Sequence, residues 1–158
     1  MMRLAKVTDY GIVLLTHFAR DDQHGWSARA LSEAATLPLP VVSKILKALV
    51  HHGILVSERG SRGGYRLARH PEHVSVADII CALDGPIALT DCSDLVGGGC
   101  TLERLCPARS NLQKINRAVR DALAGLSLAR MMQPLSPRLT IEERQPALVG
   151  GSGRIPGA

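Results

Sequence analysis

The chain has 158 residues, enough for one compact domain or for a small domain with an extension. Its apolar fraction of 46% supports a core, and because aromatic residues make up only 3%, aliphatic side chains must dominate that core. The net charge is +5, with ten Lys/Arg against five Asp/Glu in residues 1–70 and six against seven in residues 71–133. This concentration of positive charge indicates a module that contacts nucleic-acid phosphates, with an ordinary basic surface as the alternative.

Membrane and secretion signals are not found in the sequence. No stretch reaches the roughly 18 consecutive apolar residues of a membrane span, and residues 1–10 lack the basic region, apolar run and small-residue cleavage site of a secretion signal. We therefore expect a cytoplasmic protein with no membrane partner. Its thiols should stay reduced, since disulfides are rare in that compartment.

Three helices are predicted in the N-terminal third of the chain. Apolar side chains in residues 6–20 recur at the intervals of a helix with one buried stripe. Ser27 is a candidate N-cap for a second helix, which Pro38 interrupts, and a third helix is predicted over residues 41–52. Two short helices joined by a tight break predict a helix-turn-helix, with a generic pair of packed helices as the alternative.

A β-hairpin is predicted directly after the third helix. Residues 54–57 form a short apolar strand, a glycine-rich turn follows over residues 60–64, and residues 65–67 form the second strand. Glycine permits a positive φ and lets the tip approach another backbone closely. After a helix-turn-helix such a hairpin is a wing, and Arg59 and Arg62 are its candidates for contact with a phosphate backbone or a minor groove.

Two further helices are predicted after the wing. Ser75 is expected to cap a short helix over residues 76–83, in which Cys81 is interpreted as a small buried hydrophobe. Residues 108–132 contain no proline and place apolar side chains at helical intervals, which predicts a long amphipathic helix. Because helix-turn-helix proteins usually bind DNA as dimers, we expect this helix to pair with a second copy of the chain.

The expected fold class is therefore mainly α: a winged helix-turn-helix with a two-stranded wing and a long C-terminal dimerisation helix. The expected organisation is a DNA-binding domain over residues 1–84, a cysteine loop over 85–107, the dimerisation helix over 108–132, and a disordered tail over 133–158. In the third helix, Ser43, Lys44 and Lys47 lie opposite the apolar stripe and are candidates for contact with the major groove. A winged helix that binds protein would instead present an apolar recognition face.

Three of the four cysteines lie in one glycine-rich loop. Seven residues separate Cys92 from Cys100, and five separate Cys100 from Cys106, so the loop lacks the close cysteine pairs of structural zinc sites. Soft thiolates bind zinc, copper(I) or the iron of iron–sulfur clusters. Spaced thiolates can each reach a different corner of such a cluster. The spacing favours an iron–sulfur site, with zinc or a redox thiol switch as alternatives.

Three features together resemble the Rrf2-type winged-helix regulators of the IscR/NsrR family. They are the opening Met-Arg-Leu-x-Lys-x-Thr-Asp-Tyr, the wing Gly-x-x-Gly-Gly-Tyr-Arg-Leu over residues 60–67, and three spaced cysteines ahead of a long helix. The likeness runs from about residue 2 to 132. The stretches PVVSKILKAL, GGYRLAR and INRAVRDAL are most similar to the branch that regulates the Suf iron–sulfur assembly system.

The resemblance implies a homodimer that binds a pseudo-palindromic double-stranded DNA operator. Each subunit would hold a [2Fe–2S] or [4Fe–4S] cluster on Cys92, Cys100 and Cys106. The IscR type takes its fourth ligand from a histidine three residues after the last cysteine, where this chain has Arg109. The NsrR type takes it from an aspartate near the N-terminus of the partner subunit, and Asp9 occupies the matching position. Asp9 is otherwise an acid that favours the N-terminus of its helix.

An enzyme is not expected. The sequence has no phosphate-binding glycine loop leading into a helix, no nucleophile elbow and no paired carboxylates in a plausible cleft. The expected function is therefore transcriptional regulation through an iron–sulfur cluster, controlling iron–sulfur assembly or redox and nitric oxide response genes. The alternative is a winged-helix regulator that senses by thiol oxidation or by zinc.

Overall fold

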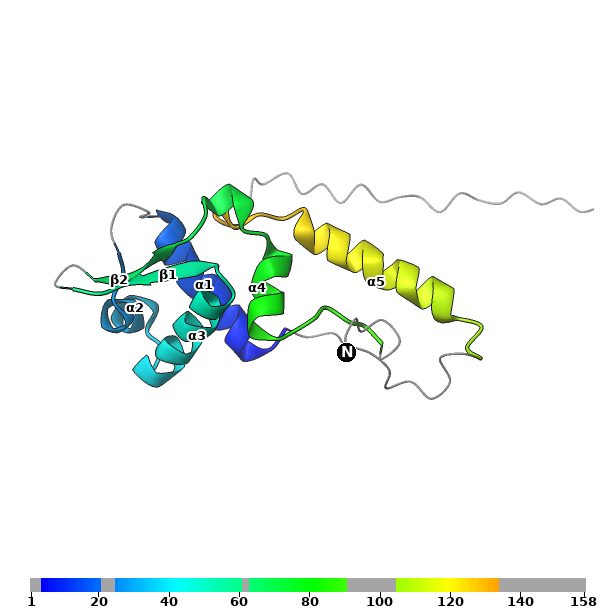
Figure 1. Ribbon diagram of the computed structural model, residues 1–158, viewed down its shortest axis with the longest axis horizontal. Helices are drawn as coiled ribbons and strands as arrows, with labels where there is room; N and C mark the ends of the chain where they lie inside the picture. The colour runs from blue at the N-terminus through cyan, green and yellow to red at the C-terminus, as the bar shows by residue number, and fades with distance from the viewer. Residues whose placement is uncertain (1–3, 21–24, 61–62, 91–104, 134–158) are drawn as a thin grey trace, which may run out of the picture.

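The computed structural model describes residues 4–20, 25–60, 63–90 and 105–133. It is mainly α-helical with one two-stranded antiparallel sheet, which confirms the predicted fold class (Figure 1). The elements are α1 Lys6–Arg20, α2 Ala28–Ala35, α3 Leu39–His51, β1 Leu55–Glu58, β2 Gly64–Leu67, a short 3-10 helix Pro71–His73, α4 Val76–Leu83, α5 Arg109–Ala124 and α6 Leu128–Met131.

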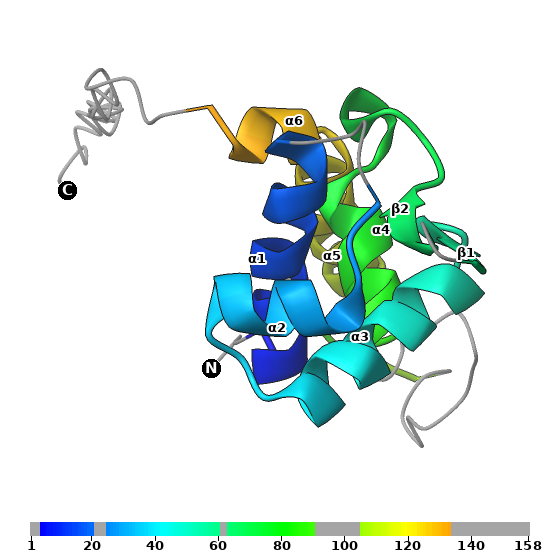
Figure 2. The ribbon, with the colours of Figure 1, turned by 90° about the vertical axis from the view of Figure 1, so that its left-hand side faces the viewer.

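The core forms where α1, α3 and α4 meet, with α2 crossing beside α1 (Figure 2). Its buried side chains are almost all aliphatic, and Phe18 is the one aromatic residue that the described chain buries fully. Gly11 lets α1 approach its neighbours, because a Cβ there would overlap the end of Leu83 on α4 and would lie 3.6 Å from Ile45 on α3. Because protein interiors are close-packed, a shift of the first turns of α1 would displace α3.

The helix-turn-helix forms as the sequence predicts. The Ser27 hydroxyl accepts a hydrogen bond from the Ala30 N–H, so Ser27 is the N-cap of α2. The turn to α3 places Thr36 in the left-handed region at φ 54°. The Ser32 hydroxyl donates a hydrogen bond of 2.6 Å to the Leu37 carbonyl and so braces this turn. α3 begins two residues earlier than predicted, because proline is compatible with the first turn of a helix.

The predicted hairpin is present, with β1 and β2 paired antiparallel from Leu55↔Leu67 to Glu58↔Gly64. Only the base of the wing is in the core: Leu55 is buried, whereas the following three residues of β1 are exposed. Across the strands, the Arg66 Nε donates to Glu58 Oε1 at 2.9 Å and the two side chains form an ion pair. A cross-strand pair of opposite charge supports the register of the wing.

α4 spans the predicted residues, and its start is a capping box formed by Ser75 and Asp78. The prediction that Cys81 is buried is wrong, because its side chain is exposed. Val76, Ile79 and Ile80 occupy the face of α4 that packs on the core. Cys81 is rotated about 100° around the helix from Ile80, away from this face, so its side chain lies at the surface.

The predicted continuous helix over residues 108–132 is replaced by α5 and α6, which are separated at Gly125. The break is explained by backbone pairing. Val76 donates to the Leu126 carbonyl and Leu128 donates to the Val74 carbonyl, each at 2.8 Å, so Ser75 and Ser127 form an antiparallel bridge. Residues 126–128 cannot make this extended pairing and continue a helix. The end of α5 is therefore fastened to the start of α4.

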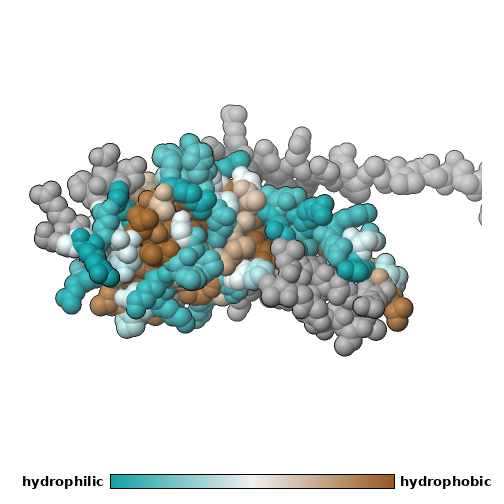
Figure 3. Space-filling view, viewed as in Figure 1, coloured by the Kyte–Doolittle hydropathy of each residue, from teal (hydrophilic) through white to brown (hydrophobic). Residues whose placement is uncertain are grey.

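α5 extends away from the core, and its outward face in the space-filling view is hydrophilic (Figure 3). Its apolar face is only partly covered, since Ile115 is 53% exposed. Val119 and Leu123 line a largely apolar cavity of about 580 Å³, whose other walls are Leu4 and the segment around residues 84–89. In the described part of the chain, no single helix is long and apolar enough to cross a membrane, although α2 and α3 meet those criteria jointly across a 119° bend.

Candidate nucleic-acid interface and thiol segment

The outward face of α3 is polar and basic. Lys44 and Lys47 are exposed and Ser43 is half-buried, whereas the opposite face places Val42, Ile45, Leu46 and Leu49 in the core. The structure thus separates the two faces as the sequence predicts. No ion pair is found for Lys44 or Lys47 among the described residues, so both ammonium groups are available to an anionic partner.

The tip of the wing adds a third exposed cation, Arg59, which is likewise without an ion pair in the part of the chain that the structure describes. Gly60 follows at φ 118°, a conformation that side chains rarely adopt, and its carbonyl accepts from the Gly63 N–H at 2.9 Å. A Cβ at Gly63 would lie 2.5 Å from the Glu58 carbonyl oxygen, so the tip requires glycine there. The other predicted wing residue, Arg62, lies outside the described residues.

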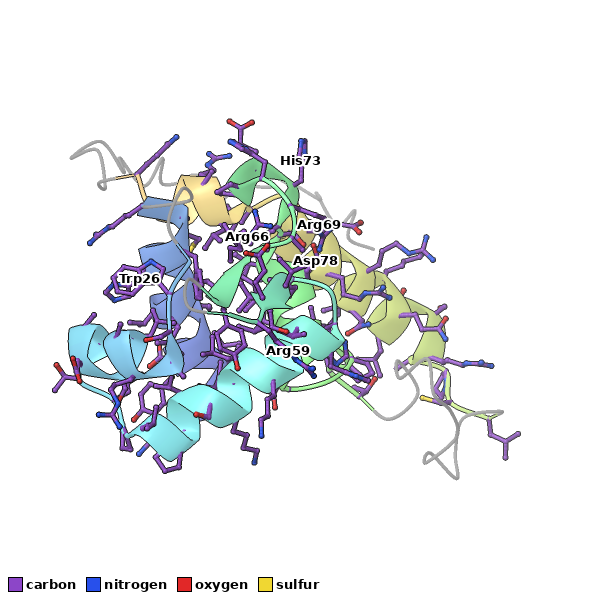
Figure 4. The ribbon with its side chains drawn as sticks, turned by 60° about the vertical axis from the view of Figure 1, so that its left-hand side comes forward. Trp26, Arg59, Arg66, Arg69, His73 and Asp78 are labelled. Atoms are coloured by element: carbon purple, nitrogen blue, oxygen red, sulfur yellow. The ribbon has the colours of Figure 1, made fainter. Side chains whose placement is uncertain are left out.

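Two other arginines of the hairpin region differ from Arg59 because they pair within the molecule. Arg66 pairs with Glu58 on the wing, and Arg69 reaches Asp78 at the start of α4 at 3.6 Å (Figure 4). The sequence alone does not show which arginines pair within the molecule and which stay unpaired. Cross-strand spacing provides a signal for the Arg66 pair, but the Arg69 pair depends on how α4 packs behind the wing.

Trp26 pairs with the free edge of β2. No sequence pattern predicted this pairing. Trp26 donates to the Tyr65 carbonyl at 2.9 Å, and Tyr65 donates to the Trp26 carbonyl at 2.8 Å. The two residues form an isolated antiparallel bridge, immediately before the N-cap of α2. The wing is therefore hydrogen-bonded to the helix-turn-helix through the end of β2 that is nearer its tip.

Of the predicted thiol ligands, Cys106 is described, and Cys92 and Cys100 lie outside the described residues. Cys106 is half-buried, forms no disulfide, and lies three residues before α5. Asp9, the predicted fourth ligand, is exposed in the first turn of α1. Within the described residues no group of three or more His, Cys, Asp or Glu side chains is placed to hold a metal ion. The complete ligand set thus remains a prediction.

A buried asparagine on α5 accepts a hydrogen bond from the residue stretch just before the segment that bears the three cysteines. Asn116 is 5% exposed and is the one buried residue of α5. Its Oδ1 accepts a hydrogen bond of 3.0 Å from the Leu89 N–H, across 27 residues of sequence. Cys92, Cys100 and Cys106 all fall between these two residues. The bond fixes Leu89, three residues before Cys92, against the middle of α5.

A helix-turn-helix, a hairpin wing and a basic outward face together define a winged-helix protein of the DNA-binding class. Comparison with known families makes the assignment specific. Residues 4–134 match the model of the Rrf2 family, which is described as an iron-dependent transcriptional regulator. The chain belongs to the Rrf2 family of transcriptional regulators. It is a DNA-binding regulator and not an enzyme, as the sequence predicts.

Individual relatives agree with this assignment. The chain is 29% identical over 159 residues to the transcriptional repressor NsrR of Streptomyces coelicolor, covering 99% of this chain and 100% of that protein. The structure of CymR, the global cysteine regulator of B. subtilis, aligns with a TM-score of 0.67 at 25% identity over 83% of this chain and 96% of that one. T. potens IscR shares the fold, with a TM-score of 0.62 at 23% identity over 82% of this chain and 85% of that one.

Proposed function

We propose that this protein is a homodimeric transcriptional regulator that senses through an iron–sulfur cluster bound by Cys92, Cys100 and Cys106. The observation behind the proposal is the placement of three thiols in the segment that joins α4 to α5, in a family described as iron-dependent. When bound, a cluster would supply a redox-sensitive centre whose presence depends on oxidants and on iron supply. Its proposed targets are genes of iron–sulfur assembly, such as the Suf system, or of the redox and nitric oxide response.

The donor set fits such a cluster chemically. Thiolates are the usual ligands of iron–sulfur iron, and Cys106 is a free thiol that is partly accessible. With Arg109 three residues after Cys106, the chain has no histidine at the position used by the IscR type. Asp9 of the partner subunit is the proposed fourth ligand, and its exposed position at the start of α1 leaves the carboxylate available to a second chain.

Homodimer formation is supported by the incompletely covered face of α5. Ile115 is exposed, and the cavity beside Val119 and Leu123 is lined mostly by apolar side chains. Burial of apolar surface contributes about 25 cal/mol per Å². A dimer in which the partner's α5 covers this face would be stabilised in this way. Pairing of two subunits would also present two α3 helices to the half-sites of one operator.

Coupling between the sensor and DNA would pass through α1. Asp9 lies two residues before Gly11, where α1 packs closely on Leu83 of α4 and lies in ordinary contact with Ile45 of α3. Engaging Asp9 at the partner's thiol site would hold the first turn of α1, and releasing it would let that turn move against α3. An effector shifts DNA affinity only through such a contact that differs between two states.

The fourth-ligand assignment is tested by Asp9→Ala in protein purified and reconstituted without oxygen. We expect faster loss of visible absorbance on chelator challenge, because one ligand is removed. Asp121→Ala, which removes an exposed carboxylate on α5, is the matched control and should behave as wild type. An Asp9→Ala variant with unchanged absorbance and unchanged DNA affinity would refute the assignment.

The alternative function is sensing by thiol oxidation or zinc. The likeness to CymR of Staphylococcus aureus, whose structure is known in an oxidized form, favours thiol oxidation as the second candidate. The visible spectrum of anaerobically purified protein separates the two functions. Brown protein with charge-transfer bands supports the cluster, whereas colourless protein with stoichiometric zinc, or with no metal, supports the alternative.

A further inference from the structure

The wing junction, defined here as Gly25, Trp26, Gly64 and Tyr65, joins the hairpin to the helix-turn-helix through backbone atoms. Trp26 and Tyr65 exchange two backbone hydrogen bonds of normal length, at 2.8 and 2.9 Å. Residue 26 is followed at once by Ser27, the N-cap of α2, and α2 packs directly against α3. The chain therefore provides a direct path from the end of β2 nearer the wing tip to the recognition helix.

The junction requires glycine at one specific position. A Cβ at Gly64 would lie 2.9 Å from the Trp26 carbonyl oxygen, a distance that real Cβ atoms essentially never show, and 3.1 Å from its carbonyl carbon, which is also tight. Because the obstacle is backbone, a side chain at residue 64 would have to push the two segments apart. Gly25 differs, since a Cβ there would lie 3.6 Å from the Tyr65 carbonyl oxygen, an ordinary van der Waals distance.

We propose that Gly64 and Trp26 are positioning residues that set where the wing meets DNA relative to α3. Without the junction, the wing would be attached through its covalent ends, through the packing of Leu55 at its base and through the half-exposed Arg69–Asp78 pair. Exposed ion pairs of this kind contribute about 0–1 kcal/mol and hold position weakly. The paired backbone groups instead fix distance and direction together. Arg59, the residue that follows β1, is then positioned through a contact made by the opposite strand.

A simpler interpretation is that the junction only covers a sheet edge and stabilises the fold. The two interpretations differ in what happens to the salt dependence of DNA binding. Loss of stability alone leaves the number of phosphate contacts in the folded protein unchanged. A displaced wing removes contacts, and each phosphate contact contributes about 0.9 to the slope of log affinity against log salt.

The experiment compares Gly64→Ala with Gly25→Ala in the full-length protein, using labelled duplex DNA of random sequence as the probe. We expect Gly64→Ala to reduce the salt slope by about 1–2 and Gly25→Ala to leave it unchanged. Arg59→Ala is then introduced into wild type and into the Gly64→Ala variant. It should weaken binding severalfold in wild type and have little further effect beside Gly64→Ala, because the contact is already lost. A slope unchanged in Gly64→Ala, or an equal loss of affinity on adding Arg59→Ala to wild type and to Gly64→Ala, would overturn the proposal.

The inference rests on the proposed contact of the wing with DNA, and the design separates the two. If Arg59→Ala has no effect while Gly64→Ala lowers the slope, the wing contacts DNA through another residue and the positioning role stands. If Gly64→Ala does not fold, hydrogen exchange in the wild-type protein decides. DNA should slow exchange at the Trp26 and Tyr65 amides together with those of β1, and protection of β1 alone would contradict the role of the junction.

Discussion

Thr36 shows how one residue in an unfavourable conformation can sit inside an otherwise well-formed motif. It is the one non-glycine residue with positive φ among those described, and it closes the turn between α2 and α3. The left-handed conformation costs an L-residue about 1–2 kcal/mol. The cost is sustained because the Thr36 N–H bonds the Glu33 carbonyl and the next residue, Leu37, bonds that of Ser32.

Replacing this residue by one that tolerates the left-handed region should stabilise the protein. We expect Thr36→Asn to raise the free energy of unfolding by roughly 0.5–1 kcal/mol, since the exposed threonine side chain loses little in exchange. Thr36→Val keeps the branched Cβ and should give no gain. Chemical denaturation measures both variants, and equal stability of the two would show that the turn is not strained at this residue.

At the scale of elements, local sequence signals predicted most of the fold. The caps at Ser27 and Ser75 and the glycines of the wing act within a few residues of the structure they specify. The Trp26–Tyr65 and Ser75–Ser127 bridges could not be predicted in the same way. Each joins segments far apart in sequence and involves a single pair, so it leaves no periodic pattern.

α5 illustrates a second limit of sequence analysis. Its apolar periodicity predicted a helix correctly, but the residue that the helix buries most deeply is the polar Asn116. Amphipathic patterning identifies which face is apolar, not which position meets an unpaired backbone N–H. The partner, Leu89, belongs to an irregular segment without helix or sheet pairing. A buried polar residue is here explained by the donor that it satisfies.

Removing this acceptor should loosen the start of the cysteine segment. We expect Asn116→Leu to lower the free energy of unfolding by about 1–3 kcal/mol, because the Leu89 N–H loses its partner. Amide exchange at Leu89 should accelerate at the same time. Asn111→Leu changes an exposed asparagine on the same helix and should alter stability by no more than about 0.5 kcal/mol. Matching behaviour of the two variants would mean that the bond contributes nothing.

At the scale of the whole molecule, the described residues form a basic DNA-binding body and an outlying helix, α5, which is attached to it at its middle and just beyond its C-terminal end. The Asn116–Leu89 bond ties the middle of α5 to the segment that follows α4. The Ser75–Ser127 bridge ties its far end to the start of α4. The segment with the three cysteines leads directly into α5. Under the proposed function, a change in that segment would therefore reach the body through α4 as well as through α1.

The dimer is tested at the apolar face of α5. We expect Ile115→Glu to convert a dimer to a monomer in sedimentation analysis and to weaken operator binding, because a charge would be buried at the interface. Lys114→Glu alters the neighbouring exposed residue by a larger change of charge. It should leave the dimer intact. Retention of the dimer by Ile115→Glu would place the interface elsewhere.

The most direct test of the account is the DNA response of a chain in which Cys92, Cys100 and Cys106 are all replaced by serine. Promoter DNA affinity would be measured without oxygen, before and after iron chelation or exposure to nitric oxide, for this variant and for wild type. If these thiols are the sensor, the DNA affinity of wild type should change with treatment and that of the triple variant should stay the same throughout. A triple variant that responds as wild type does would contradict sensing through these thiols.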